Sequence, residues 1–251
     1  MKHALISLLI CWLFFTAHSC SVKHYGALQW PQVDKQEEVL CHSYYCFIYD
    51  TNHMQSRWLA YELAGEMTTG DARRSSRFFE DSLVLRGTAN DDDYRGSGYD
   101  RGHLVPAGDM VFNDTAMRES FFYSNVSPQV PAFNRGIWKR LEENVRNYAQ
   151  NLGMIYVVTG PVLDDDLPVI GGSNVSVPAY FYKAILVQND SLNEAIAFLM
   201  PNERGEHRSL YRYSMTVSEL ERATGLNFFP QLGRRSTIEA TVDTLFWQMY
   251  E

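Results

Sequence analysis

Clusters of hydrophobic residues, separated by polar loops, divide the chain into candidate strands and helices. Segments rich in Val, Ile, Tyr and Phe predict strands, because β-branched and aromatic side chains suit a half-buried pleated surface. These segments are 39–49, 57–63, 155–159, 179–187 and 194–200. Strands and helices in irregular order favour an α+β fold over a doubly wound parallel sheet.

Two segments have helical periodicity. In Arg135–Leu152 a buried stripe is predicted, and Asn134 directly before it fits a helix N-cap. The stripe consists of Ile137, Leu141, Val145 and Tyr148. The second helix, Val217–Gly225, has Thr216 or Ser218 near its start and Gly225 as its stop. Segments 91–98 and 163–173 are rich in Asp and Gly and predict loops.

The first 19 residues have the pattern of an export signal. Lys2 precedes an apolar stretch, Ala4–Thr16, that is too short for a spanning helix of about 20 residues. Two forms of processing are open: cleavage after Ser19, or lipidation at Cys20 as in bacterial lipoproteins. Residues 1–19 are then a signal peptide, residues 20–37 a lead or tether, and residues 38–251 one domain. We expect an exported protein, secreted or held in the periplasm or cell envelope.

Cysteine spacing leaves one question open. Cys41 and Cys46 are separated by four residues, which is enough for a turn, so an oxidising compartment would allow a disulfide between them. Two buried free thiols are the alternative. No Cys-x-x-Cys or His-x-x-x-His spacing indicates zinc.

Composition narrows the function classes. The 251 residues are 45% hydrophobic and contain no repeat or low-complexity stretch, which favours a single globular domain. Lys and Arg number 22 against 30 Asp and Glu, a formal net charge of -8. This balance argues against coating long nucleic acids by bulk charge, but it allows an enzyme that grips a few phosphates through a small basic patch.

The stretch Tyr99–Pro106 carries the first chemical signal. Alternate side chains of an extended chain share a face, so Arg101 and His103 point the same way. A cation beside an imidazole suits an anionic substrate and a proton acceptor, and Arg101 would disfavour the charged imidazolium. A surface strand with an isolated histidine is the plain alternative.

A second signal lies along the first predicted helix. Asn134, Trp138, Glu142 and Arg146 recur every four residues and form one stripe. An amide, a carboxylate and a guanidinium then line one edge of a helix that is fixed by the core. A plain cap with an ion pair between Glu142 and Arg146 is the structural alternative.

Several short stretches occur in one order over residues 38–232. They are Asp100-Arg101-Gly102-His103, Ser124-Asn125 with Pro128-Gln129, Asn134-Arg135-Gly136 with Trp138 and Leu141-Glu142, Val177-Pro178 with Tyr180 and Lys183, and segments 58–63, 94–99, 158–161 and 219–226. Together they resemble the DNA/RNA non-specific endonucleases of the ββα-metal finger type. The resemblance implies a central antiparallel or mixed sheet flanked by helices, with a ββα-metal finger as the active site.

The resemblance also implies roles for individual residues. His103 would be the general base, Asn134 the direct ligand of Mg²⁺, Mn²⁺ or another divalent cation, and Glu142 would orient metal-bound water. Arg101 and Arg146 would face the phosphate. Asn125 would support the metal waters, with a purely structural role as its alternative. A further arginine of the family lies upstream, where the spacing slightly favours Arg73 over the competing Arg74 and Arg77.

The implied function is an exported, metal-dependent endonuclease that binds DNA and RNA through their phosphates, with little sequence specificity. A non-catalytic envelope lipoprotein that binds an anionic polymer or a partner on the same scaffold is the alternative. A phosphodiesterase acting on small substrates is a third hypothesis.

Overall fold

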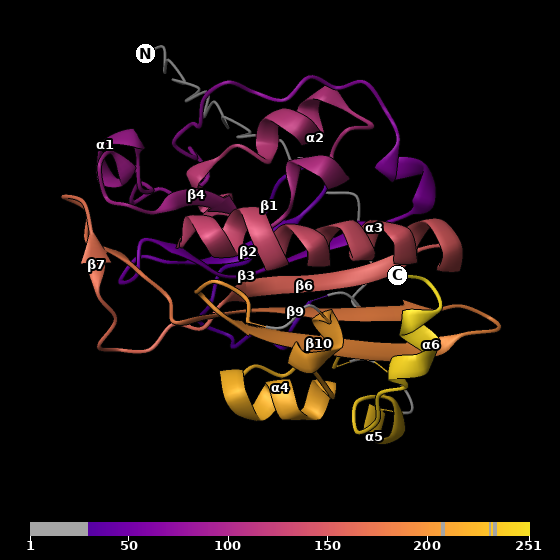
Figure 1. Ribbon diagram of the computed structural model, residues 1–251. Coiled ribbons are helices and arrows are strands. Elements are labelled where there is room, and N and C mark those ends of the chain that lie inside the picture. Colours follow the sequence, from indigo (N-terminus) through magenta and orange to yellow (C-terminus); the bar gives the residue numbers. More distant parts are fainter. Residues whose placement is uncertain (1–29, 207–208, 231, 233–234) are drawn as a thin grey trace, which may run out of the picture.

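The computed structural model describes residues 30–251 apart from 207–208, 231 and 233–234. Its centre is a seven-stranded sheet in which all neighbouring strands are antiparallel (Figure 1). In spatial order the strands are β1 (Leu40–Cys41), β2 (Cys46–Asp50), β3 (Gln55–Leu63), β6 (Ile155–Pro161), β9 (Tyr180–Gln188), β10 (Asn193–Pro201) and β11 (Ser214–Met215). The expected α+β fold with a central sheet is confirmed.

Two small hairpins and six helices complete the described part of the chain. The hairpins pair β4 (Asp100–His103) with β5 (Val126–Gln129), and β7 (Val169–Ile170) with β8 (Val175–Ser176). The helices are α1 (Asp91–Tyr94), α2 (Asp114–Glu119), α3 (Lys139–Leu152), α4 (Val217–Thr224), α5 (Arg235–Ile238) and α6 (Thr244–Gln248). None of these helices has the length and apolarity needed to cross a membrane.

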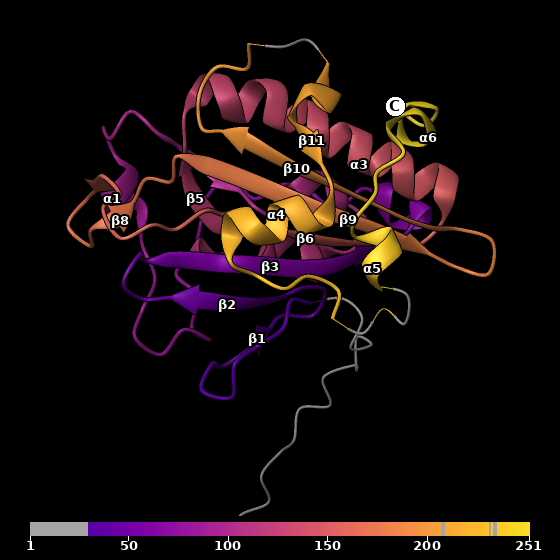
Figure 2. The same cartoon turned by 90° about the horizontal axis from the view of Figure 1, so that it is seen from below.

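The sheet is buried on both faces, and each face has its own core (Figures 1 and 2). Alternation along β3 sends Leu59 and Tyr61 to the face that α3 covers, and Trp58 and Ala60 to the face that α4 covers. The predicted stripe of α3 is buried as expected, with Ile137 6% exposed and the other three members at 0%. Because the core holds that stripe, the neighbouring stripe of the helix, which carries Glu142 and Arg146, is also fixed in position.

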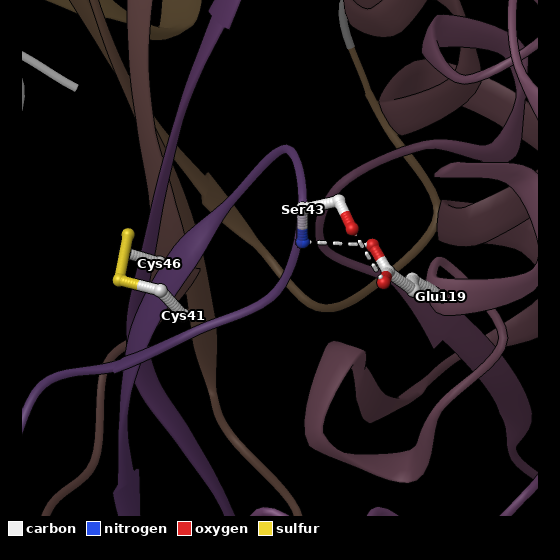
Figure 3. Close-up of a disulfide and its surroundings, with 4 residues drawn as sticks. All are labelled: Cys41, Ser43, Cys46 and Glu119. Atoms are coloured by element: carbon white, nitrogen blue, oxygen red, sulfur yellow. Dashed lines mark hydrogen bonds between the residues drawn. A yellow bond between two sulfur atoms is a disulfide. The ribbon is translucent and has the colours of Figure 1, made fainter. Parts of the chain in front are cut away.

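The predicted strand 39–49 is instead a hairpin. Residues 42–45 turn the chain, so that β1 and β2 pair with Cys41 opposite Cys46, and the two sulfurs are bonded (Figure 3). The turn is tied to α2, because the Ser43 amide and hydroxyl both donate to the Glu119 carboxylate at 2.9 Å (Figure 3). The disulfide, rather than the pair of free thiols, is therefore what the structure contains.

Helix ends follow their capping residues. Thr216 caps α4 in a reciprocal capping box with Glu219, and Gly225 ends the helix in the left-handed conformation at φ 70°. Segment 91–98, expected to be a loop, begins with α1. Asn90 and Asp93 form a capping box that sequence periodicity does not detect in so short a helix. The proposed signal segment and Cys20 lie outside the described residues.

A buried carboxylate joins the β1–β2 turn to the chain before β5. The Asp81 carboxylate is fully buried, contacts His42 Nε2 at 2.7 Å and accepts hydrogen bonds from the Ser124 hydroxyl and the Leu83 amide. Burial alone would raise the pKa of Asp81, but the bonds from His42, Ser124 and Leu83 lower it below its ordinary value. The fold therefore stabilises the ionised form.

We predict that Asp81→Asn lowers the free energy of unfolding at neutral pH by about 2–4 kcal/mol. The reason is that His42, Ser124 and Leu83 would lose the buried negative charge to which they are bound. A carboxyl group whose pKa is lowered in the folded state stabilises the protein fully above its pKa in the unfolded chain, which is about 4. This stabilisation is lost as the pH falls from there through the lower pKa of the folded state. Denaturant unfolding measured between about pH 2 and 7 should thus show that the free energy of unfolding falls less steeply toward acid pH in the variant than in the wild type. Asp190→Asn, in an exposed loop, is the control. Equal acid dependence in the wild type and Asp81→Asn would contradict the assignment.

Candidate active site

The predicted site residues meet in one open cleft of about 650 Å³. The β4–β5 hairpin, the turn leading into α3 and segment 74–78 form its walls. Five of the residues predicted for the site line it, namely Arg101, His103, Asn134, Glu142 and Arg146. Two antiparallel strands followed by a helix thus present the groups together, which is the expected ββα arrangement.

His103 ends β4 between two aromatic rings. Its imidazole lies edge-on to Phe121, with ring centres 4.8 Å apart, and 5.2 Å from Phe78. Burial, followed by the charge of Arg74, lowers the pKa of His103 to about 3. Nε2 has no hydrogen-bond partner among the described residues. The site therefore holds a neutral imidazole with an unused nitrogen.

Arg101 is anchored on the same side of β4 as His103, as predicted, since both side chains contact Phe78. Its Nε donates to the Tyr123 hydroxyl at 2.8 Å, and a terminal nitrogen lies 2.9 Å from Asp91 Oδ1. The expectation that Arg101 keeps the imidazole neutral was wrong. Burial does so first and the charge of Arg74 second, while Arg101 is paired with Asp91.

Gly102, between them, is required by close packing. A Cβ at this position would lie 2.2 Å from the Gln129 side chain of the paired strand. Gln129 is fully buried there. Any larger residue at position 102 would push the two strands of the hairpin apart, and with them Arg101 and His103.

Of the three upstream arginines that the sequence offered for the site, the structure places Arg74 at the cleft. It lines the cleft and lies over the Phe121 ring at 5.3 Å, whereas Arg77 lies over Phe79. Arg73, which the spacing favoured slightly, is not part of the cleft wall. Single-residue spacing in an irregular segment does not determine which side chain turns inward.

The turn into α3 differs from the expected plain N-cap. Residues Phe133–Trp138 form a wider, π-type turn in which Gly136 leaves helical geometry, and Ala132 occupies the cap position. The Asn134 amide nitrogen instead donates to Asp100 Oδ2 at 2.9 Å. Arg135 binds the same carboxylate through two nitrogens. With its nitrogen engaged, Asn134 keeps its amide oxygen for another partner.

Glu142 and Arg146 do not form the alternative helical ion pair. Arg146 instead binds the fully buried Asp109 at 2.8 Å, and Asp109 also accepts a bond from the Tyr61 hydroxyl. Glu142 lines the cleft with its pKa raised to about 7, chiefly by burial and also by Asp109, against the lowering effect of Lys183, Arg146 and Arg74.

Asn125 lies below the cleft and does not line it. Its amide oxygen accepts from the Val105 amide, and its nitrogen donates to the Val105 and Ser120 carbonyls at 2.7–2.8 Å. These bonds use the side chain fully and brace the backbone that follows His103. The geometry therefore favours the structural alternative for Asn125.

Sequence reasoning missed Asp109 and gave no role to Lys183. Asp109 lies in an irregular segment without a motif, so nothing in the sequence marks it as the partner of Arg146. Lys183 does carry a signal, because it is a single charge inside the apolar strand β9. It is fully buried.

A second hollow, of about 620 Å³, follows the edge of β2. Its polar lining includes Glu37, Glu38 and Asp50 together with Arg57 and Arg86, and it contains no imidazole. It lacks the combination of base, amide oxygen and clustered cations that characterises the His103 cleft.

Comparison with known proteins gives a consistent result. The chain is 35% identical over 213 residues to the mitochondrial nuclease EXOG of Danio rerio, covering 78% of this chain and 62% of that protein. It is 35% identical to human mitochondrial endonuclease G over 214 residues, covering 78% of this chain and 71% of that protein. It is 37% identical to nuclease C1 of Cunninghamella echinulata, covering 75% and 81%. The chain spans about three fifths of the length of the EXOG nucleases.

A solved structure agrees with the fold. A chain of the EndoG/EndoGI complex, described as showing the mechanism of EndoG inhibition, superposes with a TM-score of 0.75 at 31% identity. The match covers 85% of this chain and 91% of that one.

These relatives correct one expectation. An exported, periplasmic or envelope protein was expected from residues 1–19, but the EXOG and endonuclease G relatives are mitochondrial nucleases. The expectation rested on the apolar pattern of residues 1–19 alone, and these relatives show that it was wrong. The proposed lipid anchor at Cys20 has no support either.

The family model described as DNA/RNA non-specific endonuclease matches residues 30–235, a range that includes the whole cleft. The chain belongs to the DNA/RNA non-specific endonuclease family.

Proposed function

We propose that this protein is an endonuclease that hydrolyses phosphodiester bonds of DNA and RNA, with a divalent cation as cofactor. The observation that carries the proposal is the convergence of His103 and Asn134, from β4 and from the turn before α3, on one cleft. A neutral imidazole, an amide oxygen and several arginines are the groups that phosphodiester hydrolysis needs.

The donors present fit a hydrated cation such as Mg²⁺ or Mn²⁺. Asn134 would hold it through the amide oxygen, since the amide nitrogen is bound to Asp100. No group of three or more His, Cys, Asp or Glu side chains that could hold a metal occurs in the described ranges. Such a sparse protein donor set suits Mg²⁺, which keeps several of its waters. When bound, the cation would supply positive charge that stabilises the leaving oxygen.

The protein side chains would do the remaining work. His103 would accept a proton from the attacking water, which its depressed pKa allows over the whole neutral range. Arg101 and Arg74 would hold the phosphate, and their aromatic platforms restrict how far they move. Glu142 would orient water near the cation, and Arg146 would add charge from the cleft wall.

Low sequence specificity follows from the kind of contact that the cleft offers. Guanidinium groups bind phosphate oxygens, which every nucleotide presents, and phosphates carry no base information. Both DNA and RNA would therefore be substrates.

We predict that His103→Asn lowers the kcat of plasmid and RNA cleavage by about 10²–10⁴-fold, the usual contribution of a general base. Gel-based cleavage assays, with circular dichroism to confirm folding, would measure this. His53→Asn is the matched control, because His53 contacts Ser176 away from the cleft. A folded His103→Asn variant with wild-type cleavage would refute the base assignment.

Removing the proposed metal ligand should act on cation dependence. In Asn134→Ala we expect the Mg²⁺ concentration for half-maximal activity to rise by about 10-fold or more, together with a loss of kcat. Activity in both proteins should vanish with EDTA. Asn151→Ala removes an exposed amide from α3 and should change neither value. An unchanged Mg²⁺ midpoint in Asn134→Ala would exclude Asn134 as the ligand.

Cation affinity should depend on pH through Glu142. With its pKa raised to about 7, Glu142 is neutral below that pH and carries the attracting charge above it. The half-saturating Mg²⁺ concentration should therefore fall as pH rises toward about 7 and then level off. His103, with a pKa of about 3, would not contribute in this range. In Glu142→Gln the affinity should be lower and nearly independent of pH between about 5.5 and 8.5; a wild-type profile there would refute the assignment.

A further inference from the structure

Lys183 is a fully buried cation at the centre of the sheet. It lies on β9, whose other buried residues are mainly apolar, and its side chain is 0% exposed. Register places it opposite Thr159 of β6. β9 belongs to the sheet that α3 covers (Figure 1), and the Lys183 ammonium contacts the ring of Trp138, the last residue of the turn into α3.

The ammonium contacts neutral groups. Nζ donates to the Leu104 carbonyl at 3.1 Å and to the Thr159 hydroxyl at 3.0 Å. It also lies 4.5 Å from the centre of the Trp138 ring. Within the described residues no carboxylate lies within 4.0 Å of it. A buried charge without a contacting counterion is costly, so stability does not account for a lysine here.

Two of these contacts, with Leu104 and Trp138, belong to the frame of the active site. Leu104 directly follows His103, and the Trp138 indole nitrogen donates to the His103 carbonyl at 3.5 Å. Trp138 in turn lies on the helical stripe between Asn134 and Glu142. These contacts place the ammonium beside the segment that follows His103 and beside Trp138, one helical turn before Glu142.

The charges around this point form a balanced set. Glu142 and Asp109 favour the charged form of Lys183, whereas Arg146 and burial oppose it. Among the cations, Lys183 lowers the pKa of Glu142 most, and Arg146, although bound directly to Asp109 at 2.8 Å, lowers it next. Arg74 adds a weaker effect on Glu142 from the cleft side.

We propose that Lys183 is a positioning residue for hydrolysis: it fixes Trp138 and the segment after His103, and its positive charge favours the ionised form of Glu142, one helical turn beyond Trp138. The inference rests on the proposed function of Glu142. This role explains why a lysine is buried at this position although its charge is costly there. A neutral side chain of similar length, such as methionine, would avoid that cost.

The first test is Lys183→Met, with Lys183→Gln as a second neutral variant that can still donate to the Leu104 carbonyl. Both should keep or raise the melting temperature, because an unpaired buried charge is removed. Both should lower kcat by roughly 10²-fold with the KM for DNA little changed, because a displaced catalytic group costs about this much. Thr159→Val, which removes one contact of Nζ but keeps the charge, should lose less than about 5-fold in the same assay.

A double-mutant cycle separates this role from a structural one. If Lys183 acts through Glu142, Lys183→Met should cost little additional activity in a Glu142→Gln background, whereas independent effects would multiply. A second readout needs no activity. Potentiometric titration of the metal-free protein against its Glu142→Gln counterpart reports the Glu142 midpoint, which Lys183→Met should raise by about one pH unit.

The outcomes are distinct. Full kcat in Lys183→Met, multiplicative losses in the cycle, or an unmoved Glu142 midpoint would each overturn the inference. A lowered melting temperature in both neutral variants, with kcat unchanged, would assign Lys183 to stability alone. If instead the wild type cleaves no nucleic acid, the proposed function fails, while the titration still tests the coupling of Lys183 to Glu142.

Discussion

The cleft depends on the attachment of β4 to the first turns of the helical segment at both ends of the strand. At one end the Asp100 carboxylate binds the amide of Asn134 and the guanidinium of Arg135. At the other end the His103 carbonyl accepts a bond from the Trp138 indole. The contacting residues are 34 and 35 positions apart in the sequence, so this tertiary attachment fixes the imidazole relative to the amide oxygen. Asn125 and Lys183 reinforce it by binding the backbone of Val105 and Leu104.

The same frame places several groups where burial opposes their charge. Phe121 and Phe78 enclose His103, which favours its neutral form, while Glu142 and Asp109 have raised pKa values beside buried cations. Each arrangement costs folding free energy, and the two apolar cores on either side of the sheet supply the compensation. What the protein gains is a set of dipoles and charges that need little reorganisation when a substrate arrives. Such clustering of perturbed groups in one cleft is typical of a catalytic site.

Local patterns in the sequence were sufficient to predict the strands of the sheet and the long helix α3. The five apolar segments all contain strands, and Thr216 with Gly225 delimits α4 as predicted. The split of 39–49 into a hairpin was missed because both halves are apolar and the turn between them is short. Within the site, alternation along β4 placed Arg101 and His103 correctly, because a strand fixes side-chain direction. The choice between Arg73 and Arg74 failed because segment 69–77 has no regular structure to fix it.

Ion pairs between residues far apart in the sequence could not be predicted either, because they depend on how separate elements pack together. Helical spacing allowed an ion pair of Arg146 with Glu142 as the structural alternative, but Arg146 binds the buried Asp109, and desolvation strengthens that pair. Arg101 was expected to act on His103, yet Asp91 partly neutralises it and Arg74 takes its place. Spacing along one element gives the neighbours that are possible, whereas the packing of several elements selects among them.

Local charge, rather than the total, decides whether this acidic chain can hold a polyanion. Five cationic side chains line the cleft (Arg74, Arg101, Arg135, Lys139 and Arg146) against two carboxylates, Asp100 and Glu142, although the whole chain carries a formal charge of -8. Arg135 is already bound by Asp100, Arg101 by Asp91 and Arg146 by Asp109, so the field at the cleft is less positive than the count alone implies. At physiological ionic strength a charge is screened within about 8 Å, so the acidic residues elsewhere on the surface weaken binding little at the cleft itself. They act instead on nucleic acid that extends beyond it. A protein of this charge distribution would therefore bind a short stretch of nucleic-acid backbone at the cleft and have little affinity for the parts that extend beyond it.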